Sequence, residues 1–354
     1  MGKRRATLLI LPLLAVGACR KQTLVVYDVG EPPVVRTSIT QLGMTDGRAR
    51  FREIFCERFE TLRGMDAGVP DNATCDDYLH RLGGEADPPG TTTRLAVERL
   101  HVRIVGSYLG DAIPGGILPF GPSVDHLRAQ GYDIEYVTVT GGGSADYNAE
   151  MIATTLSSLP VPDDDVLLLL GYSKGTVDIM HFLVNFPDLA SDVDAVLSVS
   201  GAVNGSPLID TVPEFLADLL LWLGGGESGD GGGFESLRRS VRTQWLSEHR
   251  LPEHVRYYSL VSFTDRWNIS SILRGNYDRM SEVDPRNDSA VLFYDQVIPR
   301  GMILGYANGD HLAVAVPIID EAPLVADLMI DHNQFPRTAL LEAMLTYVLE
   351  DFAE

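Results

Sequence analysis

The 354-residue chain has little cysteine, few basic residues and none of the short metal-binding patterns. It contains three cysteines and neither a CxxC nor an HExxH pattern. Those patterns supply the paired ligands that zinc prefers, so we expect no metal and no cofactor. Lysine and arginine number 28 against 49 aspartates and glutamates, which gives a formal charge of −21. A field of that sign repels phosphate backbones, so we expect no nucleic-acid partner.

Long hydrophobic runs are also missing, except at the amino terminus. Residues 3–5 are basic, residues 8–16 are apolar, and the whole segment is too short to span a bilayer comfortably. Residues 1–18 are therefore typical of an export signal. Residues 16–19 (VGAC) resemble the lipobox of bacterial lipoproteins, which implies a mature chain that begins at an acylated Cys19. The alternative is a plain signal peptide with a nearby cysteine.

Export and acylation predict a place in the bacterial cell envelope. Removal of the signal changes the formal charge to −24, because the signal carries three basic residues and no acidic ones. An anionic membrane surface is then no electrostatic partner, and the amino-terminal lipid is the expected membrane contact. Arg20 follows Cys19, which favours the outer membrane in a host that has one. Residues 19–46 are predicted to be a tether or to contain an edge strand.

Residues 47–94 are predicted to form a helical amino-terminal segment. Apolar residues recur at helical spacing at positions 51, 54, 55 and 59, and again at 78, 79 and 82. Cys56 and Cys75 remain as an even pair in an oxidising compartment, so we expect a disulfide between these two helices. On the chain-entropy model such a short loop is worth roughly 3 kcal/mol. The alternative is two buried free thiols, and residues 83–93 indicate a linker.

Strands alternate with helices over residues 95–354. Strands are predicted at 101–107, 132–140, 166–170, 195–199, 255–262 and 302–306, and helices at 148–159, 176–186 and 338–350. This alternation predicts an α/β fold with a mostly parallel sheet covered on both faces. Residues 207–250 interrupt the pattern as an insertion. Its apolar block, residues 215–223, is either a lid over an acyl pocket or a buried helix, and the glycine run that follows favours a mobile lid.

Residues 171–175 (GYSKG) form a G-x-S-x-G pattern between the most apolar strand candidate and a helix candidate. The pattern alone is weak, but its position is informative. A tight turn from strand to helix leaves no room for side chains two residues before or after the serine, so glycine is required there. Ser173 is therefore the predicted nucleophile, and an ordinary glycine-rich turn is the alternative.

A nucleophilic serine needs a base, and an acid that orients the base. Among eight histidines, His311 lies in a loop directly after the last strand candidate, where it can reach a serine at the carboxyl edge of the sheet. A structural histidine is the alternative interpretation, and His332 is a second choice. Chain order leaves Asp288 and Asp265 as acids, and position alone does not separate them.

Four segments resemble the bacterial extracellular triacylglycerol lipases of the α/β-hydrolase superfamily. They are residues 171–175, residues 199–210 (VSGAVNGSPLID), residues 255–259 (VRYYS), and Asn287-Asp288 together with His311-Leu312. The resemblance covers roughly residues 95–320 and implies an α/β-hydrolase domain with Asp288 as the acid and Asp265 as the alternative. The chain also resembles uncharacterised bacterial lipoproteins that carry GYSKG.

The sequence departs from the lipase pattern at two positions. Ser289 stands where those lipases have a glycine after the acid. Ala313 stands at the position of their calcium ligand, two residues after the base, and an alanine side chain cannot bind a metal. We therefore expect no structural calcium at this position.

The oxyanion of an ester hydrolase needs two backbone donors. One is expected from the amide of Lys174, and the other from the turn after strand 101–107, with Tyr108 favoured over Ser107. The Lys174 side chain has two interpretations. It meets a substrate carboxylate or phosphate, or it is a solvated lysine near Asp178, and the second is favoured.

These residues predict a serine hydrolase that cleaves carboxylic esters, with acyl or otherwise apolar substrates, through an acyl-enzyme. The expected partner is a small-molecule or lipid ester. The same three residues also serve acyltransferases, thioesterases and peptidases that act on cell-envelope components. A non-catalytic binding lipoprotein with the α/β-hydrolase fold is a hypothesis of another class, and the sequence leaves the oligomeric state open.

Overall fold

The computed structural model describes residues 43–87, 90, 93–106, 117–210, 229–321 and 331–353. Several predicted features lie outside these residues. They are the export signal at residues 1–18, the acylated Cys19 and the tether as far as residue 42, Tyr108 and Ser107 of the oxyanion site, and the apolar block at residues 215–223.

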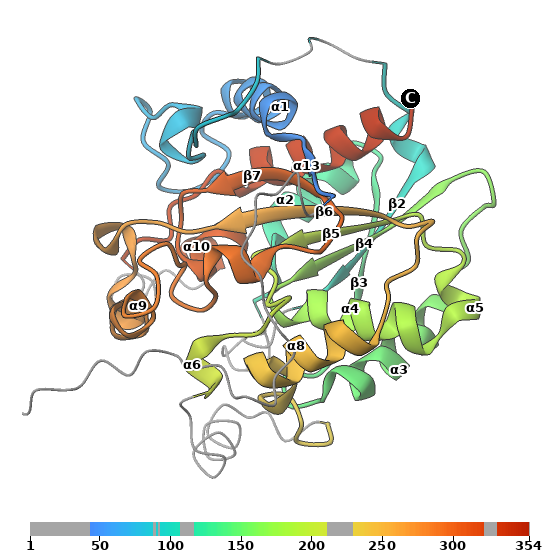
Figure 1. Ribbon diagram of the computed structural model, residues 1–354. Helices are drawn as coiled ribbons and strands as arrows, with labels where there is room; N and C mark the ends of the chain where they lie inside the picture. The colour runs from blue at the N-terminus through green and yellow to red at the C-terminus, as the bar shows by residue number, and fades with distance from the viewer. Residues whose placement is uncertain are drawn as a thin grey trace, which may run out of the picture.

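In the described part of the chain, seven parallel strands form one sheet at the centre of the molecule (Figure 1). Their order from edge to edge is β1-β7-β6-β5-β4-β2-β3. Each strand predicted after residue 95 is present, and the sheet is parallel as expected. The strands are β1 (Thr45–Asp46), β2 (Leu100–Val105), β3 (Asp133–Val137), β4 (Val166–Tyr172), β5 (Ala195–Val199), β6 (Arg256–Ser262) and β7 (Met302–Ala307).

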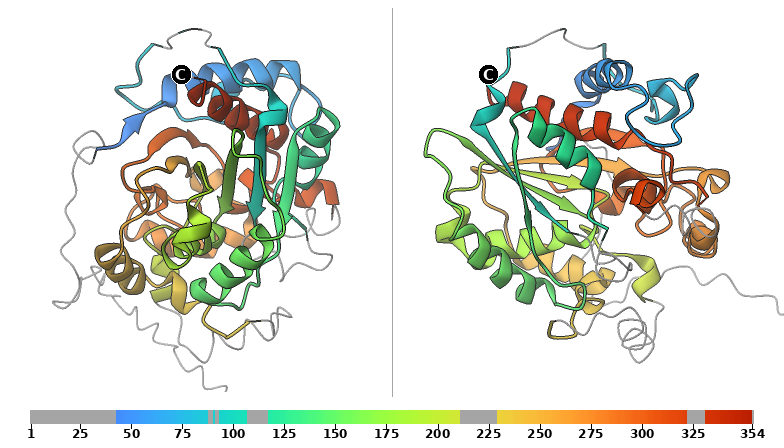
Figure 2. Two further views of the ribbon diagram at one scale, coloured as in Figure 1. Left: turned by 90° about the vertical axis from the view of Figure 1, so that its right-hand side faces the viewer. Right: turned by 180° about the vertical axis from the view of Figure 1, so that it is seen from behind.

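Helices cover both faces of this sheet (Figures 1 and 2). One face carries α1 (Arg48–Thr61), α2 (Gly121–Ala129) and α13 (Arg337–Asp351). The other face carries α3 (Ala145–Leu156), α4 (Lys174–Asn185), α5 (Pro187–Ala190) and α8 (Arg239–Glu248). Three shorter helices lie beyond the carboxyl ends of the strands: α6 (Pro207–Asp210), α9 (Arg274–Ser281) and α10 (His311–Ala315). The short helix α11 (Ile318–Glu321) follows α10 in the chain. Ligands of open α/β sheets bind at this edge.

The central strand β4 shows why its sequence is apolar without interruption. Side chains of a strand point alternately to the two faces of the sheet. Leu168 and Leu170 therefore join the core under α13, whereas Leu167 and Leu169 join the core under α4. All seven residues of β4 are buried.

The amino-terminal segment packs on the sheet rather than apart from it. Phe51 and Phe55 of α1 are fully buried in the same core as α13 and the strands. Thr45 and Asp46, at the end of the predicted tether, pair with Met302 and Ile303 of β7, so the tether ends in an edge strand.

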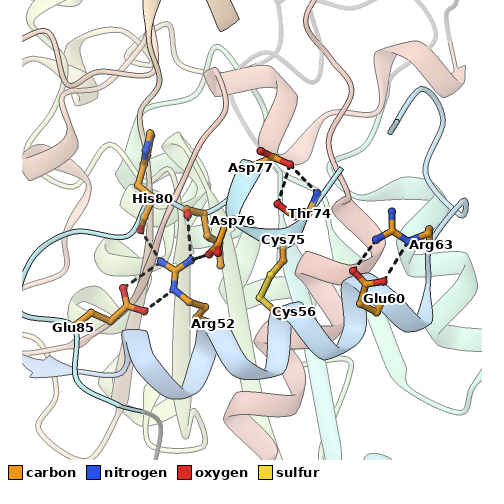
Figure 3. The surroundings of a disulfide bond; sticks show 11 residues. Arg52, Cys56, Glu60, Arg63, Thr74, Cys75, Asp76, Asp77, His80 and Glu85 are labelled. Carbon is orange, nitrogen blue, oxygen red and sulfur yellow. Dashed lines mark hydrogen bonds and ion pairs between the residues drawn. A yellow bond between two sulfur atoms is a disulfide. The ribbon is translucent and has the colours of Figure 1, made fainter. Parts of the chain in front are cut away.

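The predicted Cys56–Cys75 disulfide is present, but the second predicted helix is wrong (Figure 3). After α1, a single 3₁₀ turn spans Cys75–Asp77, and Leu79 then forms an antiparallel bridge to Ala307. The apolar residues around position 79 are buried because they pair with the open edge of β7, and a pattern of buried residues does not distinguish that pairing from a helix face.

Candidate active site

The predicted nucleophile lies in a strained turn between β4 and α4. Ser173 has φ 54° and ψ −121°, a backbone conformation that non-glycine residues rarely adopt. A Cβ on Gly171 would lie 2.6 Å from the backbone of Thr176, and a Cβ on Gly175 would lie 2.5 Å from the carbonyl oxygen of Val105. Both glycines are therefore required by close backbone approach, which is the reason inferred from the sequence.

The turn directs Ser173 toward a histidine at the start of α10 and an aspartate in the segment between α9 and β7. Ser173 Oγ lies 2.8 Å from His311 Nε2, and His311 Nδ1 lies 2.8 Å from Asp288 Oδ2. Because a carboxylate accepts hydrogen bonds, Nδ1 carries the proton and donates to Asp288, which leaves Nε2 to accept from the serine hydroxyl. All three side chains are buried, with Asp288 at 0% exposure.

The alternative candidates lie elsewhere. Asp265 is exposed, at the start of a 3₁₀ turn that follows β6, and His311 hydrogen-bonds Asp288 instead. His332, the second histidine candidate, has Nε2 3.7 Å from Asp331 Oδ2. The structure thus brings Ser173, His311 and Asp288 together and leaves both alternatives outside the cluster.

Comparison with solved structures places the chain in a family. It is 35% identical to the metagenomic carboxyl esterase MGS0156, over 91% of this chain and 97% of that esterase, with a TM-score of 0.84. The chain belongs to the α/β-hydrolase family. No family model and no curated protein sequence matches it.

Two bacterial lipases share the α/β-hydrolase fold at lower identity. The mature form of the lipase BlEst2 from Bacillus licheniformis is 18% identical over 67% of this chain and 94% of that chain, with a TM-score of 0.50. The lipase from Staphylococcus hyicus is 13% identical over 75% of this chain and all of that chain, with a TM-score of 0.55. At these identities the likeness concerns the fold.

In this α/β-hydrolase, five donors surround the buried carboxylate of Asp288. The backbone amides of Ala290 and Val291 donate to Oδ1 at 2.9 and 2.7 Å. Besides His311, Ser262 Oγ and Gln296 Nε2 donate to Oδ2 at 2.6 and 3.3 Å. This shell compensates the charge for its loss of water and fixes the carboxylate toward His311.

Sequence reasoning missed Ser262 and Gln296. Ser262 is the last residue of β6, a strand end at the carboxyl edge of the sheet, and that position was the available signal. No sequence signal pointed to Gln296, because its role depends on hydrogen bonds to Ser262, which is distant in the chain. Its side-chain oxygen accepts from Ser262 N at 2.6 Å and its nitrogen donates to Ser262 O at 2.7 Å, as a neighbouring strand would.

The turn around Asp288 also explains the departure at Ser289. Ser289 has φ 78°, in the left-handed region that glycine adopts at less cost. Its amide donates to Asn287 Oδ1 at 3.0 Å, which holds the turn. The turn thus holds a serine in this conformation, and Asp288 Oδ2 lies 2.8 Å from His311 Nδ1.

The loop that carries His311 is fixed by buried polar groups. Asp310 begins α10 as its N-cap: it accepts from Ala313 N at 2.8 Å and from Ser270 N at 2.8 Å, while burial raises the pKa of its carboxyl group. His311 N donates to Asp288 O at 2.8 Å, and the Tyr172 hydroxyl donates to His311 O at 2.5 Å. The imidazole is thus oriented through both backbone and side chain.

The expectation of a solvated Lys174 side chain is wrong. Lys174 Nζ lies 2.6 Å from Asp178 Oδ1, and both side chains are 1% exposed. Asn148 Nδ2 donates to the other oxygen of Asp178 at 2.9 Å, and burial raises the pKa of that carboxyl group. One turn of helix separates the two residues, so the lysine side chain lies along α4 and is removed from solvent.

The backbone of Lys174 lies at the amino terminus of α4. It is the first residue of α4, where amide groups have no acceptor within the helix. Gly175 abuts the carbonyl oxygens of Val105 and Gly106 at the end of β2, so the chain that leaves β2 passes beside this helix start. Ser107 and Tyr108, the next two residues in the sequence, lie outside the described residues.

Neither metal ligation nor a membrane span is supported by the described residues. No group of three or more His, Cys, Asp or Glu among them is placed to hold a metal ion. In the same part of the chain, no helix is long and apolar enough to cross a membrane. Ala313, at the position of the lipase calcium ligand, is 2% exposed.

Proposed function

We propose that this α/β-hydrolase is a serine hydrolase that cleaves carboxylic esters through an acyl-enzyme. Ser173 attacks the ester carbonyl, and His311 accepts the serine proton and passes it to the departing alcohol. Asp288 orients His311 and stabilises the imidazolium. Water then attacks the acyl-enzyme with His311 as the base, which releases the acid and restores the serine.

The single observation that carries this proposal is the continuous hydrogen-bonded chain Ser173–His311–Asp288 at the start of α4. The identity of 35% with a carboxyl esterase supports an ester substrate. We assign one oxyanion donor to the amide of Lys174 and the other to residues 107–108. An acyl or otherwise apolar ester is the proposed substrate, because residues 215–223 of the insertion are mostly apolar in sequence.

Fluorophosphonate labelling of the purified protein tests the proposal. We expect labelling of the wild type and its loss in Ser173→Ala and His311→Ala. Asp288→Asn should lower the labelling rate and the esterase kcat on the order of 10³- to 10⁴-fold, because the amide no longer holds the correct imidazole tautomer.

Asp265→Asn is the matched control, since it makes the same change in the alternative acid. Its rate should stay within about twofold of wild type. An unlabelled but folded wild type, or equal losses in both aspartate variants, would contradict the proposed machinery.

A further inference from the structure

A segment near the amino terminus completes the sheet beside the histidine loop. Residues 75–85, here called the strap, pass the carboxyl end of β7, beyond the part that β1 covers, and Leu79 forms an antiparallel bridge to Ala307 there. His80 N donates to Tyr306 O at 2.8 Å, and Asn308 N donates to Tyr78 O at 2.8 Å. The strap therefore ends its pairing three residues before His311.

Asn308 joins the strap to the rest of this edge. Its Nδ2 donates to Asp77 O in the strap at 2.9 Å, and its Oδ1 accepts from Thr264 Oγ1 at 2.6 Å. Both polar atoms of the Asn308 side chain thus form hydrogen bonds. Asn308, which begins the segment that leads to His311, is therefore held from two sides.

Aromatic packing supports the same loop from behind. Tyr78 of the strap packs edge-on against Phe335, with ring centroids 5.3 Å apart. Phe335 in turn lies against Gly309, where an added Cβ would come within 3.0 Å of the ring. The path from the strap to the His311 loop is therefore closely packed as well as hydrogen-bonded.

Arg52 of α1 clamps the outer side of the strap (Figure 3). Its guanidinium donates to the carbonyl oxygens of Leu79 and His80 at 3.1 and 2.8 Å. It also pairs with Asp76 at 2.8 Å and with Glu85 at 2.5 Å, although the side chain is buried. A planar group with five donors holds the strap at four points.

The disulfide provides the second attachment of the strap. Cys56 lies one helical turn after Arg52, and its bond to Cys75 holds the first residue of the strap on α1 (Figure 3). The helix itself is fixed on the body by Phe51 and Phe55, which are fully buried in the core that α1 shares with α13. The connected path runs from α13 through α1 and the strap to the loop of His311.

We propose that the strap, held by Arg52 and the Cys56–Cys75 disulfide, is a positioning element for His311. The inference rests on the proposed function, since it concerns the base of that reaction. Arg52 touches neither substrate nor the reacting atoms, so it acts as a positioning residue. Displacement of a catalytic group by about 1 Å can cost on the order of 100-fold in rate, so a loosened strap should slow the chemistry without unfolding the protein.

Arg52→Gln and Arg50→Gln form a matched pair for the test. Both remove an ion-paired guanidinium from α1, with side-chain exposures of 8% for Arg52 and 12% for Arg50, but Arg50 contacts Glu53 and Glu350 rather than the strap. The fluorophosphonate end point counts competent sites, and the rate constant of labelling reports the serine–histidine pair. For Arg52→Gln we expect an unchanged end point, a labelling rate and a kcat at least tenfold lower, and an unchanged KM. Arg50→Gln should keep both rates within twofold, and Arg52→Lys should recover part of the loss.

Reduction of the disulfide gives a second measurement, which uses the wild-type chain and needs no substitution. A thiol-free phosphine reductant should slow labelling of the wild-type full chain, and reoxidation should restore it. The Cys56→Ala/Cys75→Ala double variant should be slow from the start and unresponsive to the reductant. Because this variant keeps Cys19, it also controls for an effect of the reductant at that residue.

The outcomes separate the inference from the proposed function. If Arg52→Gln and the double-cysteine variant label as fast as Arg50→Gln, the strap has a purely structural role and the inference is wrong, while Ser173 keeps its assignment. If Ser173→Ala retains full esterase activity, the proposed function fails first. Should Arg52→Gln not fold, Arg52→Lys and reversible reduction decide the question.

Discussion

Ser262 is the residue on which the orientation of the predicted acid depends most directly. Its hydroxyl donates the shortest hydrogen bond to Asp288 Oδ2, at 2.6 Å, and its backbone is held by Gln296. Asp288 is fully buried, so a lost donor cannot be replaced by bulk water. Removal of this hydroxyl should therefore affect both stability and rate.

For Ser262→Ala we expect the free energy of unfolding to fall by about 1.5–3 kcal/mol, the range for a hydrogen bond to a charged group. We expect kcat to fall about tenfold, because the carboxylate is less firmly held. Ser259→Ala is the control: Ser259 is buried in the same strand and accepts from Ile298 N instead. Chemical denaturation and ester kinetics measure both quantities, and equal kcat values in the two variants would count against the role of Ser262.

Helix α4 combines the turn of the nucleophile with a cluster of buried charges. His181 of α4 accepts from Arg242 of α8 through Nε2 at 2.7 Å and donates from Nδ1 to Asp146 at 2.7 Å. Arg242 is fully buried and also lies 4.7 Å from the ring of Trp245. Burial, together with the neighbouring guanidinium, lowers the pKa of His181 to about 4.

This pKa makes the stability of the fold dependent on pH. The unfolded chain binds a proton at His181 near pH 6.5, but the folded chain does so only near pH 4, so unfolding is favoured as pH falls through that window. Between pH 7.5 and pH 5, protonation of His181 in the unfolded chain should lower the free energy of unfolding by about 2 kcal/mol. Urea unfolding of the wild type and His181→Gln should show the smaller pH dependence in the variant. If the free energy of unfolding depends on pH equally in the two proteins, His181 is not the source of the pH dependence.

At the scale of the whole molecule, the described part of the chain is one α/β unit that includes the amino-terminal segment. α1 shares the core of α13 and the strands, and the strap completes the edge of β7. We propose that this body is exported and held at the cell envelope by acyl chains on Cys19. The formal charge of −24 after removal of the signal offers no electrostatic attraction to an anionic membrane, so the lipid must supply the attachment.

Acylation at Cys19 predicts that the full chain, expressed in a bacterial host, incorporates labelled palmitate. Cys19→Ala should remove the label and release the protein from the membrane fraction, because the acyl chains are the proposed anchor. Cys75→Ala should keep the label and serves as the control. If Cys19→Ala retains the label, the interpretation of residues 16–19 as a lipobox is wrong.

The sequence by itself determined the parts of this protein that depend on local sterics and periodicity. The alternation of strands and helices predicted the parallel sheet. The two glycines around Ser173 predicted a tight turn in which the neighbouring backbone leaves no room for a side chain. His311 followed from its place directly after the last strand. Each of these inferences needs only neighbours in the chain.

The tertiary structure decided what depends on contacts between distant segments. Asp288 and Asp265 were equivalent by position, and the hydrogen bond from His311 to Asp288 separates them. The direction of Lys174 depended on the burial of Asp178, and the strap formed instead of a helix because β7 offered an open edge. Burial and strand pairing are properties of the assembled core, so no local pattern could specify them.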